Sequence, residues 1–155
     1  MIPTNEQIAA LVRDDSVHKS VYTDPQLFAL EMQRIYGQAW IYVGHESQVK
    51  KPGDYHTTRI GDQDVILVRG ADKRVNVLYN RCPHKGAKLV AEGDGNVGKF
   101  FRCPYHAWTF KLDGQHLSAP LKNAFEGTCF NPSHPDFSMV GLARVDSYRG
   151  FAFAS

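Results

Sequence analysis

The 155-residue sequence has almost no excess of charge of either sign. Its 18 Lys and Arg residues are balanced by 16 Asp and Glu, and the densest basic stretch is Lys50-Lys51. Nucleic-acid binding depends on clustered cations that neutralise phosphates. The composition therefore argues against a nucleic-acid partner.

Long apolar runs are also missing. The longest aliphatic run is Val65-Ile66-Leu67-Val68, whereas a helix that spans a bilayer needs about 20 apolar residues. The N-terminus has no basic stretch followed by an apolar segment of the kind that directs secretion. We therefore expect no membrane association and a cytoplasmic location.

Cysteine is scarce, since three residues cannot build a disulfide framework. In a protein without secretion signals, cysteine more often binds metal than forms disulfides. Cys129 lies between Thr128 and Phe130, and we expect it to pack as a small apolar side chain.

Helical periodicity is confined to the front of the sequence. Thr4 or Asn5 can cap a short helix, and Asp24 followed by Pro25 can begin a second one. We expect residues 1–39 to form a helical arm.

Short β-like runs fill the rest of the sequence, separated by turn signals. The expected strands are 40–43, 54–60, 64–69, 75–79, 99–102, 108–112 and 140–146. Residues 40–155 should therefore form a mainly β domain, an antiparallel barrel or sandwich with a single core.

One glycine-rich stretch, Gly93-Asp94-Gly95-Asn96-Val97-Gly98, formally matches the dinucleotide-binding pattern. That function needs a strand before the glycines and a helix after them. The following Lys99-Phe100-Phe101-Arg102 is typical of a strand, so we interpret the glycines as a turn.

The most informative residues are two short runs, Cys82-Pro83-His84 and Cys103-Pro104-Tyr105-His106. Two thiols and two imidazoles suit either zinc or iron-sulfur chemistry. Zinc fingers commonly pair Cys with Cys and His with His, whereas here each run contains one of each. With one residue between them, Cys82 and His84 should diverge, which suits two irons better than one tetrahedral ion. In a Rieske cluster, two His replace two Cys on one of the two irons.

These runs resemble the Rieske motifs of bacterial aromatic-ring-hydroxylating oxygenases, in particular their large α subunits. The similarity to the benzoate- and terephthalate-type α subunits extends to three further runs: Tyr22-Thr23-Asp24-Pro25, Gly44-His45-Glu46-Ser47-Gln48 and Arg149-Gly150-Phe151. Ala107 departs from the family pattern, in which Gly is common, and it requires a compatible backbone angle.

The resemblance implies a Rieske-type fold whose small cluster-binding subdomain, at about residues 80–110, holds a 2Fe-2S cluster. Cys82 and Cys103 would bind the buried iron. His84 and His106 would bind the outer iron, and their exposed imidazoles would form the electron port.

The resemblance also implies a part that this sequence does not supply. The family's α subunits carry a C-terminal catalytic domain, in which two His and a carboxylate hold a mononuclear non-haem iron. The remaining histidines lie in separate segments: His18, His45, His56, His116 and His134. We therefore expect the electron-transfer domain of an oxidoreductase of aromatic hydrocarbon catabolism, without the iron that activates oxygen.

The expected partners are a reductase or ferredoxin as electron donor, and other oxygenase subunits in an assembly that is often trimer-based. Four cations flank the two runs: Arg81, Lys85, Lys88 and Arg102. They can dock an acidic donor or remain solvated loop charges. Two other functions stay open, namely a stand-alone Rieske ferredoxin, which has no use for the helical arm, and a structural zinc-binding domain.

Overall fold

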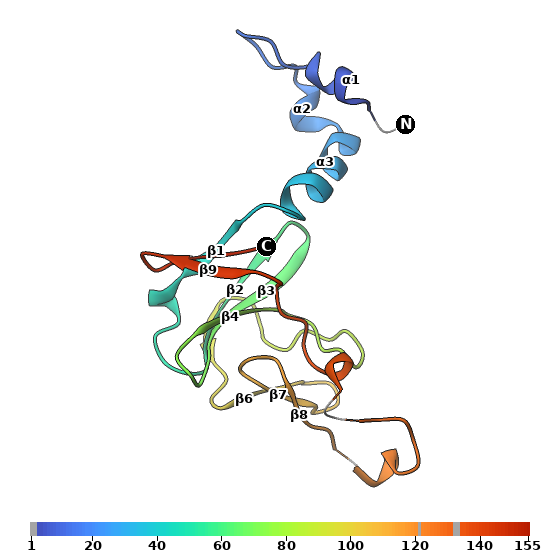
Figure 1. Ribbon diagram of the computed structural model, residues 1–155, viewed down its shortest axis with the longest axis vertical. Helices are drawn as coiled ribbons and strands as arrows, with labels where there is room; N and C mark the ends of the chain where they lie inside the picture. The colour runs from blue at the N-terminus through green and yellow to red at the C-terminus, as the bar shows by residue number, and fades with distance from the viewer. Residues whose placement is uncertain (1–2, 121, 132–133) are drawn as a thin grey trace. The chain divides into compact units, whose positions relative to one another are not determined.

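The computed structural model describes residues 3–120, 122–131 and 134–155 (Figure 1). The chain divides into two compact units between Ala39 and Trp40. No helix within the described residues is long and apolar enough to cross a lipid bilayer.

The first unit is helical. Its elements are α1 (Asn5–Ala9), α2 (Ser20–Thr23), α3 (Pro25–Glu31) and a π-helical turn, η1 (Met32–Tyr36). The Thr4 hydroxyl caps α1 by accepting a hydrogen bond from the Gln7 N–H. The Asp24 carboxylate caps α3 by accepting one from the Gln26 N–H at 2.7 Å. The second expected helix therefore begins where its cap predicts, but it changes type at Met32.

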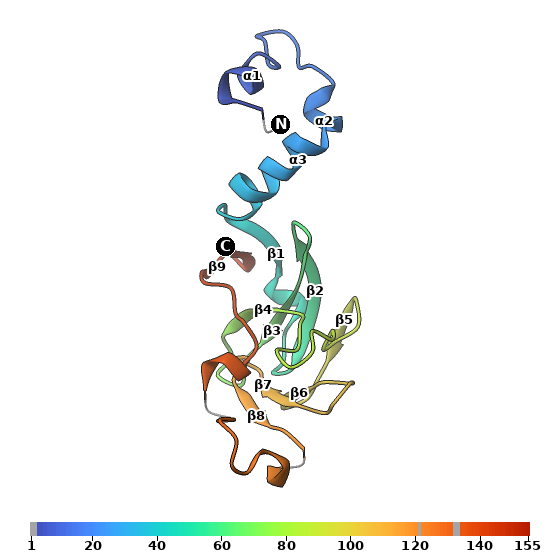
Figure 2. The same ribbon diagram turned by 90° about the vertical axis from the view of Figure 1, so that its right-hand side faces the viewer.

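The second unit contains three antiparallel sheets (Figure 2). The four-stranded sheet has the order β4-β3-β2-β5, with β2 (Asp54–Ile60), β3 (Gln63–Arg69), β4 (Val75–Tyr79) and β5 (Asp94–Asn96). One three-stranded sheet has the order β1-β10-β9, with β1 (Ile41–His45), β9 (Val145–Tyr148) and β10 (Phe151–Ala154). The other is β6-β7-β8, with β6 (Phe100–Arg102), β7 (Thr109–Lys111) and β8 (His116–Ser118). Short 3-10 turns are η2 (Glu46–Gln48), η3 (Lys122–Phe125) and η4 (Pro135–Phe137). The expected mainly β, antiparallel fold is confirmed.

Strand β3 explains how these sheets pack. Successive side chains of a strand point to opposite faces, and the side chains of β3 are buried on both. Val65 and Leu67 belong to the core that includes residues of β1 and β10. Ile66 and Val68 belong to the core that includes residues of β6 and β7. The four-stranded sheet therefore lies between the two three-stranded sheets, so the unit has two cores where the sequence predicted one (Figure 1).

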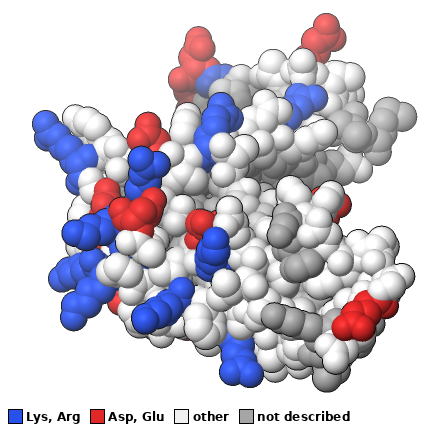
Figure 3. All heavy atoms as spheres, turned by 60° about the horizontal axis from the view of Figure 1, so that its bottom comes forward, with Lys and Arg blue, Asp and Glu red and all other residues white. Residues whose placement is uncertain are grey.

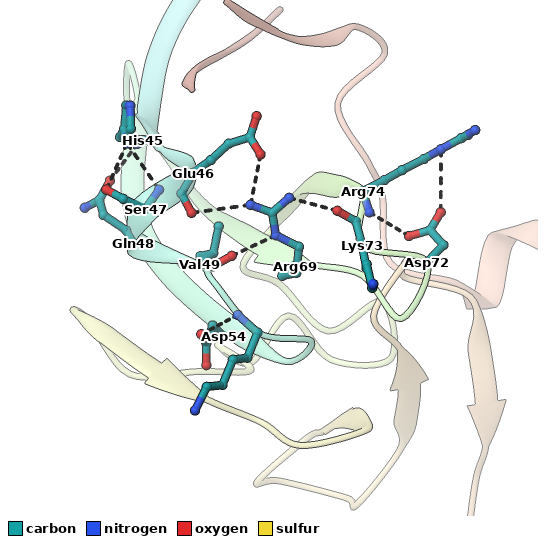
Figure 4. A network of polar contacts seen from close by, with 11 residues as sticks. His45, Glu46, Ser47, Gln48, Val49, Asp54, Arg69, Asp72, Lys73 and Arg74 are labelled. Carbon is teal, nitrogen blue, oxygen red and sulfur yellow. Dashed lines mark hydrogen bonds and ion pairs between the residues drawn. The ribbon is translucent and has the colours of Figure 1, made fainter. Parts of the chain in front are cut away.

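Arg69, at the end of β3, joins this strand to the segment that follows β1 (Figure 4). Its Nε donates to the Val49 carbonyl at 2.7 Å, and its Nη1 donates to the Lys73 carbonyl at 2.8 Å. Its Nη2 donates to Glu46 Oε2 at 3.0 Å. Only 12% of the Arg69 side chain is exposed, so these bonds replace the water that a buried cation would otherwise need.

The glycine-rich segment is a correction to the expected turn, because it contains strand β5. Gly95 pairs with Tyr55 of β2, and a Cβ at Gly95 would lie 2.6 Å from the Tyr55 hydroxyl. Gly93 and Gly98 have φ of 103° and 72° and supply the turns on either side. The next element is strand β6, which does not fit a dinucleotide-binding loop.

The last expected strand, 140–146, is also corrected. Strand β9 begins only at Val145. Before it, Val140 and Leu142 make backbone hydrogen bonds to β4 without forming a regular strand. The apolar run therefore borders β4 first and enters the β1-β10-β9 sheet later.

Candidate metal centre

The first Cys- and His-containing run forms a tight turn after β4, the first loop (residues 82–87). The Cys82 N–H donates to the Ala87 carbonyl and the Gly86 N–H donates to the Cys82 carbonyl, both at 2.8 Å. Gly86 has a φ of 74°, in the left-handed region that glycine adopts without steric cost. The loop therefore closes directly on its cysteine.

The second run, between β6 and β7, forms the second loop (residues 103–108) with the same closure. The Cys103 N–H donates to the Trp108 carbonyl at 2.8 Å, and the Ala107 N–H donates to the Cys103 carbonyl at 3.0 Å. Ala107 takes the left-handed position with a φ of 56°, at a cost of about 1 kcal/mol. The departure from the family's glycine thus affects the energy of the loop and leaves its closure intact.

Asn80, just before the first loop, supports it from inside. Its side chain is buried; its Oδ1 accepts from the Leu89 N–H at 2.8 Å, and its Nδ2 donates to the Val90 carbonyl at 2.9 Å. These bonds tie the two ends of the loop region together. Sequence reasoning missed Asn80, because an Asn beside a loop is equally typical of an exposed turn.

The two loop cysteines lie in the same apolar core, each with 2% of its surface exposed. Burial raises the pKa of the Cys82 thiol, and the neighbouring Cys103 thiol adds to this rise. The backbone N–H groups of His84 and Lys85 bond to the Cys82 sulfur and oppose the increase in its pKa. A bound metal cation would overcome the cost of burial, since a coordinating thiol is deprotonated.

The two loop imidazoles are neighbours, with ring centroids 4.7 Å apart. His106 is exposed and His84 is half-buried. Nδ1 of His84 is buried, and the described part of the chain offers it no hydrogen-bond partner. Burial lowers the pKa of His84, and the nearby His106 and Lys85 lower it further. The neutral imidazole, which is the form that binds metal, is therefore favoured.

Each imidazole has an aromatic neighbour from the second loop. The Trp108 indole, 5% exposed, stacks on the His84 ring with centroids 4.7 Å apart and planes 6° apart. The ring centroids of Tyr105 and His106 are 3.8 Å apart, and Tyr105 is 66% exposed. The neighbour of His84 is thus buried, and that of His106 faces solvent.

The family model for the Rieske 2Fe-2S domain matches residues 39–143, a range that includes both loops. The chain belongs to this family. The cofactor of this Rieske domain is accordingly a 2Fe-2S cluster.

Known oxygenases contain similar domains. The α subunit of benzene 1,2-dioxygenase from Pseudomonas putida is 37% identical over 135 residues, which cover 87% of this chain and 29% of that protein. The oxygenase subunit of carnitine monooxygenase from Acinetobacter baumannii is 38% identical over 87% of this chain and 35% of its own length. The structure of naphthalene 1,2-dioxygenase from Rhodococcus sp. bound to indole has a TM-score of 0.85 at 28% identity, over 98% of this chain and 36% of that one. The Rieske chain thus spans about a third of the length of such relatives.

The donor groups of the Rieske domain fit a two-iron cluster. Within the described residues, no three or more His, Cys, Asp or Glu side chains gather as ligands of one ion. The four donors instead form two pairs, with Cys82 and Cys103 inside the core and His84 and His106 toward solvent. Nδ1 of His84 is buried without a hydrogen-bond partner, and a bound iron would supply one by accepting its lone pair. The structure brings the four predicted residues together, and their binding of iron stays a prediction.

The cations that flank the loops differ in their partners. Lys88 Nζ lies 2.8 Å from Asp64 and 3.3 Å from Glu92, so its charge is largely compensated. Arg81, Lys85 and Arg102 are exposed, and none of them is in an ion pair within the described residues. On the face drawn in Figure 3, Asp and Glu side chains lie among the Lys and Arg side chains. The loops therefore have a few free cations beside them.

The expectation for Cys129 is wrong, because this cysteine is exposed. Its neighbour Phe130 packs against Phe125 with ring centroids 4.2 Å apart. The apolar contact that the sequence indicated is therefore made by the two phenylalanines, while Cys129 is exposed.

Proposed function

We propose that this chain is the electron-transfer domain of a Rieske oxygenase α subunit, which accepts electrons from a reductase or ferredoxin and passes them to a mononuclear iron. The proposal rests on one observation above all. The four donors divide into a buried thiol pair and an imidazole pair toward solvent within a Rieske domain. Matches to oxygenase subunits over 87% of the chain favour an oxygenase over a free-standing ferredoxin or a structural zinc domain.

Each donor has its own part in this function. Cys82 and Cys103 would hold one iron, and the apolar core around them excludes water. His84 and His106 would hold the other iron. When bound, the cluster supplies a one-electron redox couple. The exposed His106 brings that couple to the protein surface, while the N–H groups of His84 and Lys85 that bond to the Cys82 sulfur favour its thiolate.

The electron donor would dock where His106 is exposed. The uncompensated charges of Arg81, Lys85 and Arg102 suit an acidic reductase or ferredoxin, since charge complementarity raises association rates. Arg102→Glu should therefore slow reduction by such a donor about tenfold at low salt. Lys50→Glu changes the net charge equally at a distance from the loops in sequence and serves as the control. An equal rate for both variants would contradict this docking site.

The remaining parts of the enzyme belong to the same proposal. The relatives are about three times as long as this chain, which supports a catalytic part outside these residues that holds the mononuclear iron and the substrate. We assign the benzoate- and terephthalate-type subgroup on the three runs that carry this resemblance, Tyr22-Thr23-Asp24-Pro25, Gly44-His45-Glu46-Ser47-Gln48 and Arg149-Gly150-Phe151. The relatives named above act on benzene, naphthalene and carnitine, so they support the family and not this subgroup. A cytoplasmic location, a helical arm over 1–39 and a trimer-based assembly complete the proposal.

The function is tested with the cluster-loaded chain. We expect it to accept a single electron from dithionite or a ferredoxin, followed by bleaching of its visible absorption. We also expect no hydroxylated product from an aromatic acid and oxygen when this chain is the only oxygenase component. Oxygen-dependent product from this chain alone would contradict the assignment, as would a cluster that no donor reduces.

A further inference from the structure

Trp108 occupies a special place in the second loop. Its carbonyl closes the loop on Cys103, and the matching position of the first loop is Ala87, which has no side chain beyond Cβ. Trp108 therefore adds a large aromatic group at a point where the two loops are otherwise alike.

The indole reaches across to the other loop. It lies on the His84 ring with 6° between the planes and 4.7 Å between the centroids. Its other neighbours are also aromatic, with ring centroids of His116, Phe130 and Phe137 at 4.9, 5.6 and 6.2 Å. Rings on several sides restrict rotation of a side chain that is only 5% exposed.

We infer that Trp108 is a positioning residue for His84, which fixes the plane of this imidazole and shields one of its faces from water. The inference rests on the proposed assignment of His84 as an iron ligand. His106 has no such support, because the Tyr105 ring beside it is 66% exposed. The two imidazoles would therefore differ in their freedom to rotate.

Shielding by Trp108 has a consequence for the redox potential. Two iron(III) ions and two sulfides carry a formal charge of +2, which two thiolates and two neutral imidazoles bring to zero, so reduction by one electron leaves a net negative charge. Water near the imidazoles stabilises that charge, and solvent exposure is one determinant of the potential of iron-sulfur clusters. Trp108 therefore lowers the potential by keeping water away from one face of His84.

The test uses three variants of the cluster-loaded chain. Trp108→Leu removes the flat ring, and Trp108→Phe keeps a smaller one. Phe101→Leu is the matched control, because Phe101 is fully buried in β6 of the same core. The readouts are the g values of the dithionite-reduced protein by electron paramagnetic resonance, the midpoint potential, and the iron content.

We expect Trp108→Leu to change the g values and raise the potential, and Trp108→Phe to shift both in the same direction by less. Phe101→Leu should lower the melting temperature and leave both unchanged. Wild-type g values and potential in a loaded Trp108→Leu would overturn the inference, as would an equal shift in Phe101→Leu. If Trp108→Leu does not load, an unshifted Trp108→Phe would overturn it as well. A wild-type chain without a Rieske spectrum would instead refute the proposed function, and this inference with it.

Discussion

The first and second loops share a backbone closure but present their imidazoles differently. In each loop, the same two hydrogen bonds close the chain on the cysteine. His84 is the second residue after its cysteine, whereas His106 is the third. The sixth residue also differs, since it is Ala87 in the first loop and Trp108 in the second. As a result, the His84 imidazole lies against a buried indole, while His106 is exposed. The shared backbone thus explains why both thiols are buried. The different side-chain positions explain why the two imidazoles differ in exposure.

Removal of either imidazole should have the largest effect. Under the proposed assignment, His84→Ala or His106→Ala would deprive one iron of a ligand, so we expect loss of the cluster in both variants. Visible absorption and electron paramagnetic resonance of the reduced protein measure the loss. His134→Ala is the control, since that ring accepts a hydrogen bond from the Asp136 N–H in an exposed turn. A full Rieske spectrum in His106→Ala would contradict the ligand assignment.

The Arg69 network differs from the two imidazoles, because the polar atoms of Arg69 already have hydrogen-bond partners within the chain. Arg69→Met leaves the Val49 and Lys73 carbonyls without these donors, so we expect a loss of about 2–3 kcal/mol in the free energy of unfolding. Urea unfolding measures this loss, and the cluster spectrum should not change. Arg74→Met removes a pair with Asp72 in which the Arg side chain is 87% exposed, and it should cost less than about 0.5 kcal/mol. An equal loss of unfolding free energy in the two variants would show that the Arg69 hydrogen bonds do not stabilise the fold.

The fifth residue is Gly86 in the first loop and Ala107 in the second, so each can be replaced by the other's residue type. We expect these two substitutions to have smaller and opposite effects on stability. Ala107→Gly relieves a left-handed alanine and should stabilise the protein by about 1 kcal/mol. Gly86→Ala should destabilise it by a similar amount, because Gly86 has a positive φ while the added Cβ would meet only ordinary contacts with Arg81. Thermal unfolding of the loaded protein measures both. If both variants gained stability or both lost it, the positive φ would not be the main cause of the effect.

The Glu46–Arg69 pair predicts a small dependence of stability on pH. The hydrogen bond from Arg69 is the main cause that lowers the pKa of Glu46 below its ordinary value of 4.5, and Ser147 adds to it. The unfolded chain then binds the proton more tightly, so the stabilisation is complete above about pH 4.5 and is lost as the pH falls through the lowered pKa. With a third of the side chain exposed, we expect less than about 1 kcal/mol. Melting temperatures of wild type and Glu46→Gln should differ near pH 7 and converge near pH 3, whereas a constant difference would refute the linkage.

The sequence predicted what depends on residue type and local spacing. The caps at Thr4 and Asp24 are visible as hydroxyl or carboxylate before a helical pattern, and the structure confirms them. Strands β2 and β4 have the bounds that alternation indicated. The sequence also predicted that the first and second loops meet, because two Cys and two His residues in two short runs are best explained by one site.

Other features depend on contacts between distant segments. The stack of Trp108 on His84 joins the two loops, and no local pattern specifies it. The exposure of Cys129 follows from how its neighbours pack, and β5 forms because β2 presents an edge to which three residues can pair. Asn80 has its supporting role only because Leu89 and Val90 return to it.

The most direct test of the central claim is a measurement of iron, acid-labile sulfide and the pulsed electron paramagnetic resonance of the dithionite-reduced wild type labelled with ¹⁵N-histidine. The account predicts about two irons and two sulfides per chain, and a signal with hyperfine coupling to two histidine nitrogens, because two His replace two Cys on one iron. Those couplings would come from His84 and His106. Stoichiometric zinc without sulfide, or a cluster signal with no histidine coupling, would contradict it.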